Sequence, residues 1–187
     1  MKDRQKDQMT AAQLHDGDNA FDPLDMVESI LTEEGLTFER TPEGDLGFAL
    51  KGDWRTYEMW FSWRPEGECL QLCCSLDVES GVGVPLAENR LGGLYELLCL
   101  VNSHVWFGHF EVFRDTEDQE ETIEVVFRLT QGLSLADRSA MLSGAHMINS
   151  AAEAVDRFYP AFDFWFKGAE TAQAAFSACL FETQGEA

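Results

Sequence analysis

Two of the four histidines lie close together in the most aromatic part of the chain. His104 and His109 are five residues apart within VNSHVWFGHFEVF, residues 101–113. This spacing does not place two metal ligands on one face of a helix, as the HExxH motif does. No third ligand accompanies them at a characteristic spacing. The pair therefore favours a structural junction over a metal site.

Two of the five cysteines lie on one face of a predicted strand. Cys69 and Cys73 are four residues apart, and their sulfurs could bind zinc if one of the two histidines approached them. The favoured interpretation is a semi-polar outer face of a sheet or a dimer surface. The cysteine count is odd and no CxxC pair occurs, which argues against a disulfide framework and fits reduced cytosolic thiols.

Motifs of catalysis and phosphate binding are missing from the sequence. The GVG at residues 81–83 is not followed by GK[ST], and no serine lies in a GxSxG motif. The acidic run at 114–121 lacks the central glycine and the bidentate glutamate of an EF-hand loop, which indicates a solvated hairpin tip. We therefore expect no enzymatic activity, no cofactor and no bound metal.

The net charge restricts the classes of partner. The 187-residue chain carries 34 acidic and 13 basic residues, a formal charge of −21. Phosphate backbones and anionic lipid surfaces repel so acidic a protein, so nucleic acid and membrane are poor partners. A basic or dipolar protein surface is a better one. The charged N-terminus lacks an apolar segment of the kind found in signal peptides, so we expect a cytoplasmic location.

Hydrophobic periodicity predicts the elements that position these residues. Apolar and polar residues alternate over consecutive runs separated by tight turns, which is typical of an antiparallel meander with one buried face. The strands cluster instead of alternating with helices, so the predicted class is α+β with an antiparallel sheet, in the order α-β(3)-α-β(2)-α. The expected helices are 23–34, 86–103, Ser134 to about 167, and a short one within 169–181. The expected strands are 46–50, 56–63, 69–76, 106–113 and 122–129, with a short additional strand at 36–40.

Two features of the predicted helices are unusual. Pro160 should kink or split the long helix, because proline lacks the N–H that the helix interior needs. The pair Gly92–Gly93 weakens the second helix by roughly 1 kcal/mol per glycine relative to alanine. Such a pair is useful where a helix must approach the sheet closely.

Aromatic residues exceed what a single core stripe needs. They occur on both faces of strand 56–63 and around the end of the long helix. Surplus aromatics outside a core predict a protein–protein surface, with a contact between two copies of the chain as one form. The alternative is a long helix buried on two sides within one subunit. The candidate protein-binding residues are Trp60, Phe61, Trp63, Phe164 and Trp165.

Four sequence segments carry a resemblance to a known family, which extends over about residues 22–175. They are EEGLTFER, YEMWFSW, LVNSHVWFGHFEVF and DRFYPAFDFWFKG. With them the chain resembles the YbjN-domain family, a bacterial group also described as sensory transduction regulators. In such proteins an asparagine at a helix end is often followed by a short spacer and a Gly-aromatic entry to the next strand. Asn102 and Gly108–His109–Phe110 occupy that pattern here.

The resemblance implies a fold like that of type III secretion chaperones: helix, three strands, helix, two strands, helix. It implies no known catalytic residues. Secretion chaperones are small acidic dimers that hold extended segments of client proteins. The long polar N-terminal segment and the extra C-terminal helix depart from a minimal chaperone.

These observations give two hypotheses for one domain at 22–181, between flexible tails at 1–21 and 182–187. The first is a cytoplasmic, non-enzymatic regulatory or chaperone-like protein that binds other proteins, with a homodimer as one form. The second is a small-ligand or metal sensor that uses His104, His109 and Cys73.

Overall fold

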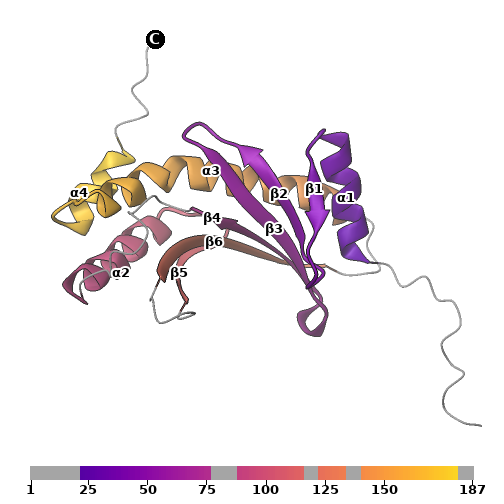
Figure 1. Cartoon of the computed structure of the whole chain (residues 1–187), viewed down its shortest axis with the longest axis horizontal. Helices are drawn as coiled ribbons and strands as arrows, with labels where there is room; N and C mark the ends of the chain where they lie inside the picture. The colour runs from indigo at the N-terminus through magenta and orange to yellow at the C-terminus, as the bar shows by residue number, and fades with distance from the viewer. Residues whose placement is uncertain (1–21, 77–87, 116–121, 134–139, 181–187) are drawn as a thin grey trace, which may run out of the picture.

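The structure, a computed structural model, describes residues 22–76, 88–115, 122–133 and 140–180. They include a six-stranded antiparallel sheet with the strand order β1-β2-β3-β4-β6-β5 (Figure 1). The strands are β1 Phe38–Arg40, β2 Leu46–Lys51, β3 Thr56–Arg64, β4 Cys69–Ser75, β5 His109–Asp115 and β6 Thr122–Gly132. The helices are α1 Pro23–Glu33, α2 Glu88–Asn102, α3 Ala140–Phe166 and α4 Ala172–Ala178, with a short 3-10 turn at Pro65–Gly67.

The predicted α+β class with an antiparallel sheet is confirmed. Four strands precede α2, one more than in the order α-β(3)-α-β(2)-α. The additional strand is the short β1, which pairs with β2 and lies within the short strand expected at 36–40. The strand expected at 106–113 begins at His109, and the residues before it form a linker. Residues 114–115 of the hairpin loop expected at 114–121 belong to β5. The rest of that loop, the expected tails 1–21 and 182–187, and the cap at Ser134 lie outside the described residues.

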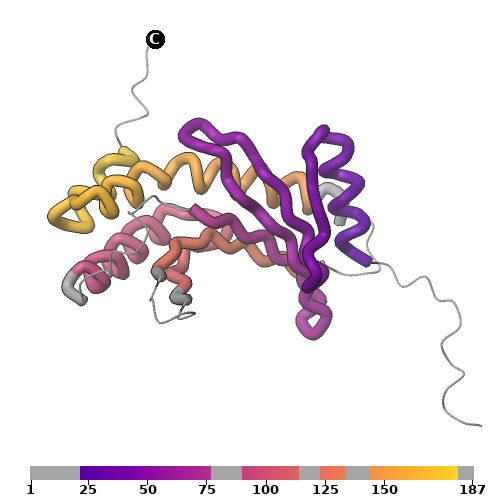
Figure 2. Tube along the Cα trace, in the orientation of Figure 1, coloured from indigo at the N-terminus to yellow at the C-terminus, as the bar shows by residue number. Residues whose placement is uncertain are grey.

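One face of the sheet forms the core. Phe110 of β5 contacts Phe158 and Phe162 of α3, with ring centroids 5.9 and 5.2 Å apart. The helix α3 therefore lies against this face, while α1 lies near one end of α3 and α2 and α4 lie at the other (Figure 2). The alternation predicted for β3 is confirmed, since its inward residues Tyr57, Met59 and Phe61 are buried.

The helix α3 continues through Pro160, so the expected split is wrong. Proline cannot donate to the carbonyl four residues earlier, which belongs to Asp156. The indole Nε1 of Trp54 donates to that carbonyl at 2.9 Å and replaces the missing donor. The Asp156 carboxylate also accepts from the Tyr57 hydroxyl at 2.8 Å and the Asp53 amide at 3.0 Å. These hydrogen bonds to Asp156, one turn before Pro160, therefore hold the turn between β2 and β3 against α3.

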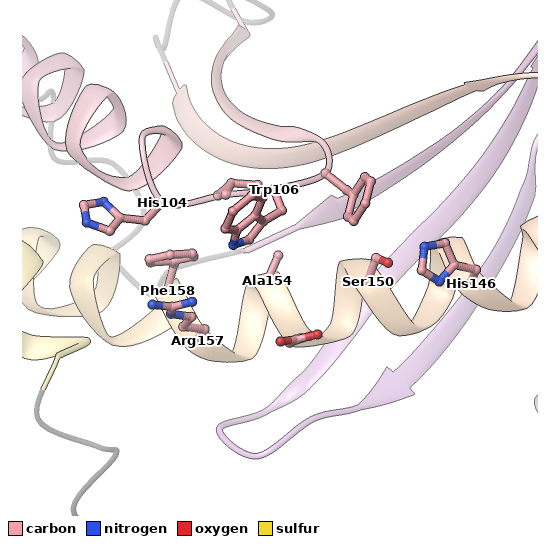
Figure 3. A pocket seen from close by; sticks show the side chains of 10 residues that line it. His104, Trp106, His146, Ser150, Ala154, Arg157 and Phe158 are labelled. Atoms are coloured by element: carbon pink, nitrogen blue, oxygen red, sulfur yellow. The ribbon is translucent and has the colours of Figure 1, made fainter.

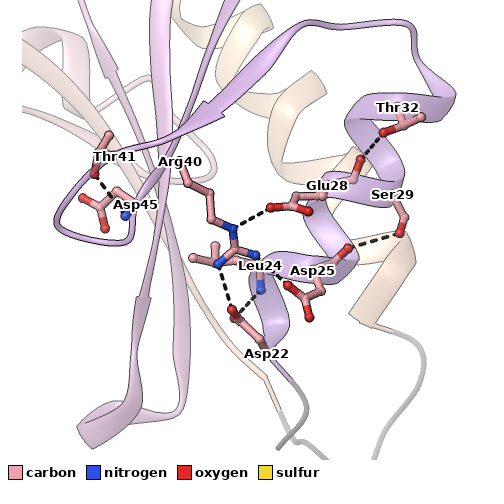
Figure 4. Close-up of polar contacts among 9 residues, drawn as sticks. All are labelled: Asp22, Leu24, Asp25, Glu28, Ser29, Thr32, Arg40, Thr41 and Asp45. Atoms are coloured by element: carbon pink, nitrogen blue, oxygen red, sulfur yellow. Dashed lines mark hydrogen bonds and ion pairs between the residues drawn. The ribbon is translucent and has the colours of Figure 1, made fainter. Parts of the chain in front are cut away.

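A cluster of charges joins α1 to β1 (Figure 4). Arg40 of β1 pairs with Asp22, Asp25 and Glu28, and Asp22 also caps α1 by accepting from the Leu24 amide at 2.9 Å. The hydrogen bonds to Glu28 and Asp22 raise the pKa of the Arg40 guanidinium. Because these side chains are partly exposed, we expect the cluster to orient α1 more than to stabilise the fold.

Candidate functional site

The joint between α2 and β5 is built around one amide side chain. Asn102 ends α2, and its Nδ2 donates to the Phe110 carbonyl at 2.9 Å. Its Oδ1 accepts from the Phe110 amide at 2.7 Å. The side chain thus pairs with β5 as a neighbouring strand would, on the side away from β6. Phe110 is thereby fixed with its ring in the core.

Gly108 makes the turn from the linker into β5. Its φ of +77° is a conformation that side-chain-bearing residues rarely adopt. A Cβ at this position would lie 2.6 Å from the Phe127 ring and 2.7 Å from the Arg128 carbonyl oxygen. Only glycine therefore fits between the linker and β6. Asn102 and Gly108 fix the two ends of the linker.

The linker between these two positions carries exposed aromatic side chains. Trp106 is 90% exposed and Phe107 is 59% exposed. Large apolar side chains are normally hidden from water, and exposure on this scale marks a candidate contact surface. Because the linker is bound at both ends, the two side chains are held outside the core.

A groove of about 190 Å³ lies between this linker and one stripe of α3 (Figure 3). The linker contributes residues 104–107. The helix contributes side chains at successive turns, spaced by three or four residues, so they share one face. The helical lining includes His146, Ser150, Glu153, Arg157 and Phe158.

Ring contacts set the two ends of the groove. At one end the His104 ring lies 4.9 Å from the Phe176 ring of α4, and its Nδ1 lies 3.0 Å from the Leu100 carbonyl oxygen. At the other end Phe107 contacts the His146 ring edge-on at 5.8 Å. The Arg157 guanidinium lies 5.1 Å from the centroid of the Phe158 ring.

The five aromatic residues predicted for protein binding do not form one surface. Phe61 is fully buried and Trp165 is 3% exposed, so the exposure expected of them is wrong. Trp60 and Trp63 are half-buried on opposite faces of β3, and Phe164 on α3 is 46% exposed. The prediction that these residues bind a protein remains a prediction for Trp60, Trp63 and Phe164.

The helix α2 covers Trp165. A Cβ on Gly93 would lie 2.3 Å from the Trp165 ring, and Arg90 lies 4.3 Å above the same ring. Gly93 therefore permits close approach to α3, whereas the sequence suggested approach to the sheet. The long helix is buried on two sides at this point, as the alternative interpretation held.

The three residues of the sensor hypothesis lie apart. Register places Cys73 next to Arg128, and Arg128 next to His109, on the outer face of the sheet. His109 is exposed with its Nε2 3.5 Å from Glu111, whereas His104 lies in the linker beside α4. Burial raises the pKa of the Cys73 thiol to about 11. Within the described ranges, no three His, Cys, Asp or Glu side chains cluster as metal ligands do.

Only weak signals for the groove are present in the sequence. The apolar run predicts a strand that includes Trp106 and Phe107, although Gly108 directly after them is a signal that the strand begins later. His146, Glu153 and Arg157 were not singled out, because polar residues on the second face of an amphipathic helix are normally only solvated.

Among the described helices, none combines the length and apolar character that crossing a membrane requires.

Comparisons with known proteins identify one family. The YbjN family, described as "Putative bacterial sensory transduction regulator", matches residues 23–164. A solved structure of YbjN from E. coli, described as "a putative transcription regulator", has 10% sequence identity and a TM-score of 0.46. The match covers 71% of this chain and 88% of that one. No curated protein matches the chain.

Proposed function

We propose that this chain, which belongs to the YbjN family, is a non-enzymatic regulatory or chaperone-like protein that acts by binding other proteins. The family description names regulators of sensory transduction and no catalytic activity. A regulator without catalysis acts through contacts, so the proposal requires a contact surface.

The exposed Trp106 and Phe107 are the observation that carries the proposal. Tryptophan is enriched among the residues that dominate binding energy at protein interfaces. Because Asn102 and Gly108 fix the two ends of the linker, the backbone that carries these two aromatics loses little conformational freedom on binding. The groove beside them gives a partner a concave surface against α3.

A cytoplasmic location is part of the proposal. All five cysteines are free thiols, and two of them, Cys73 and Cys74, are neighbours on β4. Free thiols persist in reducing compartments, which supports this location.

Comparative affinity capture from the native cell tests the proposed function. The double variant Trp106→Ala, Phe107→Ala should lose the partners that the wild-type chain retains. Because both side chains are largely exposed, the substitutions should change the free energy of unfolding by no more than about 0.5 kcal/mol.

The matched control is Phe113→Ala, which removes an aromatic ring of 53% exposure on β5, outside the groove. It should retain the partners. If the double variant retains every partner of the wild type while remaining folded, the linker is not the contact surface. If neither chain retains any partner, binding of other proteins is not the function.

A further inference from the structure

Two charged side chains in the groove have no ion-pair partner among the residues that the structure describes. Glu153 and Arg157 are one turn apart on the groove-lining stripe of α3, and both are exposed. A glutamate four residues before an arginine is the favoured order for a helical ion pair. Neither side chain nevertheless forms an ion pair or hydrogen bond with the residues that the structure describes. The guanidinium donors of Arg157 therefore remain available to a ligand.

The size of the groove limits what it can bind. Its volume of about 190 Å³ is below the roughly 300–1,000 Å³ of sites that enclose a small-molecule ligand. One large side chain of a partner suits such a volume better than a whole ligand. The walls that would contact it are the aromatic residues Trp106, Phe107 and Phe158.

The charge of Arg157 and the net charge of the chain determine which group of the partner should lie beside that side chain. Arginine presents a planar set of donors that pairs with both oxygens of a carboxylate. With a net charge of −21, however, the whole chain repels a strongly acidic segment. The complementary ligand therefore has a single carboxylate in a segment of otherwise low charge.

We infer that the groove binds a segment of a partner protein through one large apolar side chain and an adjacent carboxylate, which pairs with Arg157. This inference rests on the proposed function and specifies the chemistry of the partner. Glu153, one turn away, acts in the opposite sense because it repels the same carboxylate.

The probe that tests this inference is the blocked peptide acetyl-Gly-Ser-Phe-Asp-Ser-Gly-amide. NMR titration of the full chain should show amide shifts that concentrate in residues 104–107 and 146–158. Arg157→Gln should weaken binding of this peptide by roughly three- to fivefold, the effect of a solvent-exposed ion pair. Glu153→Gln should strengthen it by about twofold.

Three controls distinguish an ion pair between Arg157 and the peptide carboxylate from an effect of the protein's net charge. Arg64→Gln makes the same change in net charge at an exposed position outside the groove, and it should leave the affinity unchanged. A peptide with Asn in place of Asp should bind wild type and Arg157→Gln equally well. A peptide with Ala in place of Phe should bind more weakly than the parent peptide to every variant.

The outcomes distinguish this inference from the proposed function. Equal weakening by Arg157→Gln and Arg64→Gln, or amide shifts confined to the outer face of the sheet, overturns the inference. Partner loss with the Trp106, Phe107 double variant, together with no binding of the peptide by the wild-type chain, also overturns it and leaves the proposed function standing. Peptide binding with the predicted signs supports the inference.

Discussion

Asn102 is the residue on which the position of the linker depends. Its amide occupies the backbone donor and acceptor of Phe110, which would otherwise lie unpaired at the edge of the sheet. Unpaired backbone groups near a core are costly because they lose their hydrogen bonds to water. The Asn102 side chain thereby makes, at Phe110, the hydrogen bonds that a further neighbouring strand would make.

Asn102→Ala should lower the free energy of unfolding by about 1–3 kcal/mol, because it leaves the amide and carbonyl of Phe110 without partners. Urea denaturation measures the change. Asn149→Ala removes an exposed amide from α3 and should cost less than about 0.5 kcal/mol. Equal costs for the two substitutions would show that the Asn102 bonds contribute nothing specific.

The raised pKa of the Cys73 thiol predicts that the stability of the fold depends on pH. Burial raises its pKa to about 11, from an ordinary value near 9. The folded chain therefore retains a proton that the unfolded chain releases, and the free energy of unfolding falls as pH rises from about 9 to about 11. Urea denaturation across this range should show a smaller decline for Cys73→Ala than for wild type. Part of the decline should remain, because burial also raises the pKa of Cys74 and of Tyr57. Parallel declines would contradict the role of Cys73.

At the scale of elements, sequence patterns predicted strands better than junctions. Alternation identified β2, β3, β4 and β6, because each has one buried face. It placed the start of β5 at residue 106, three residues early, because the aromatic residues of the linker continue the apolar run. The role of Pro160 depended on Trp54, more than 100 residues away, and no local pattern carries that information.

Trp54 and Pro160 should be energetically coupled. Trp54→Phe should cost about 1 kcal/mol, since it removes the donor to the Asp156 carbonyl. In a Pro160→Ala background the Ala N–H can serve that carbonyl, so the same substitution should cost less. A double-mutant cycle in urea measures the difference. Strict additivity would contradict the account of how the helix accommodates its proline.

Gly108→Ala should destabilise the chain by at least about 2 kcal/mol, because a left-handed conformation and crowding against Phe127 both oppose a side chain. Thermal unfolding measures the loss. Gly92→Ala is the matched control in α2, where a Cβ meets nothing within 4 Å. That substitution should stabilise the chain by up to about 1 kcal/mol. A tolerated Gly108→Ala would mean that the linker can enter β5 in another way.

At the scale of the whole molecule, composition and periodicity predicted the fold class but not the surface. Periodicity assigns a residue to one face of an element, and it does not show what covers that face. Phe61 lies in the hydrophobic core and Trp165 lies beneath α2, so both are buried although the sequence placed them in a contact surface. Among the aromatics that the structure describes, Trp106 has the largest exposed fraction, and it lies in a linker for which the sequence predicts a strand.

The central claim is that the linker contacts other proteins, and site-specific photocrosslinking in the native cell tests it most directly. A photoreactive phenylalanine analogue would replace Phe107 in the full chain, with the same analogue at Phe113, which is 53% exposed on β5, as the control. We predict a crosslink from position 107 to a protein of different sequence, and little or none from position 113. Crosslinks only between two copies of the chain, or equal yields at both positions, would contradict the claim.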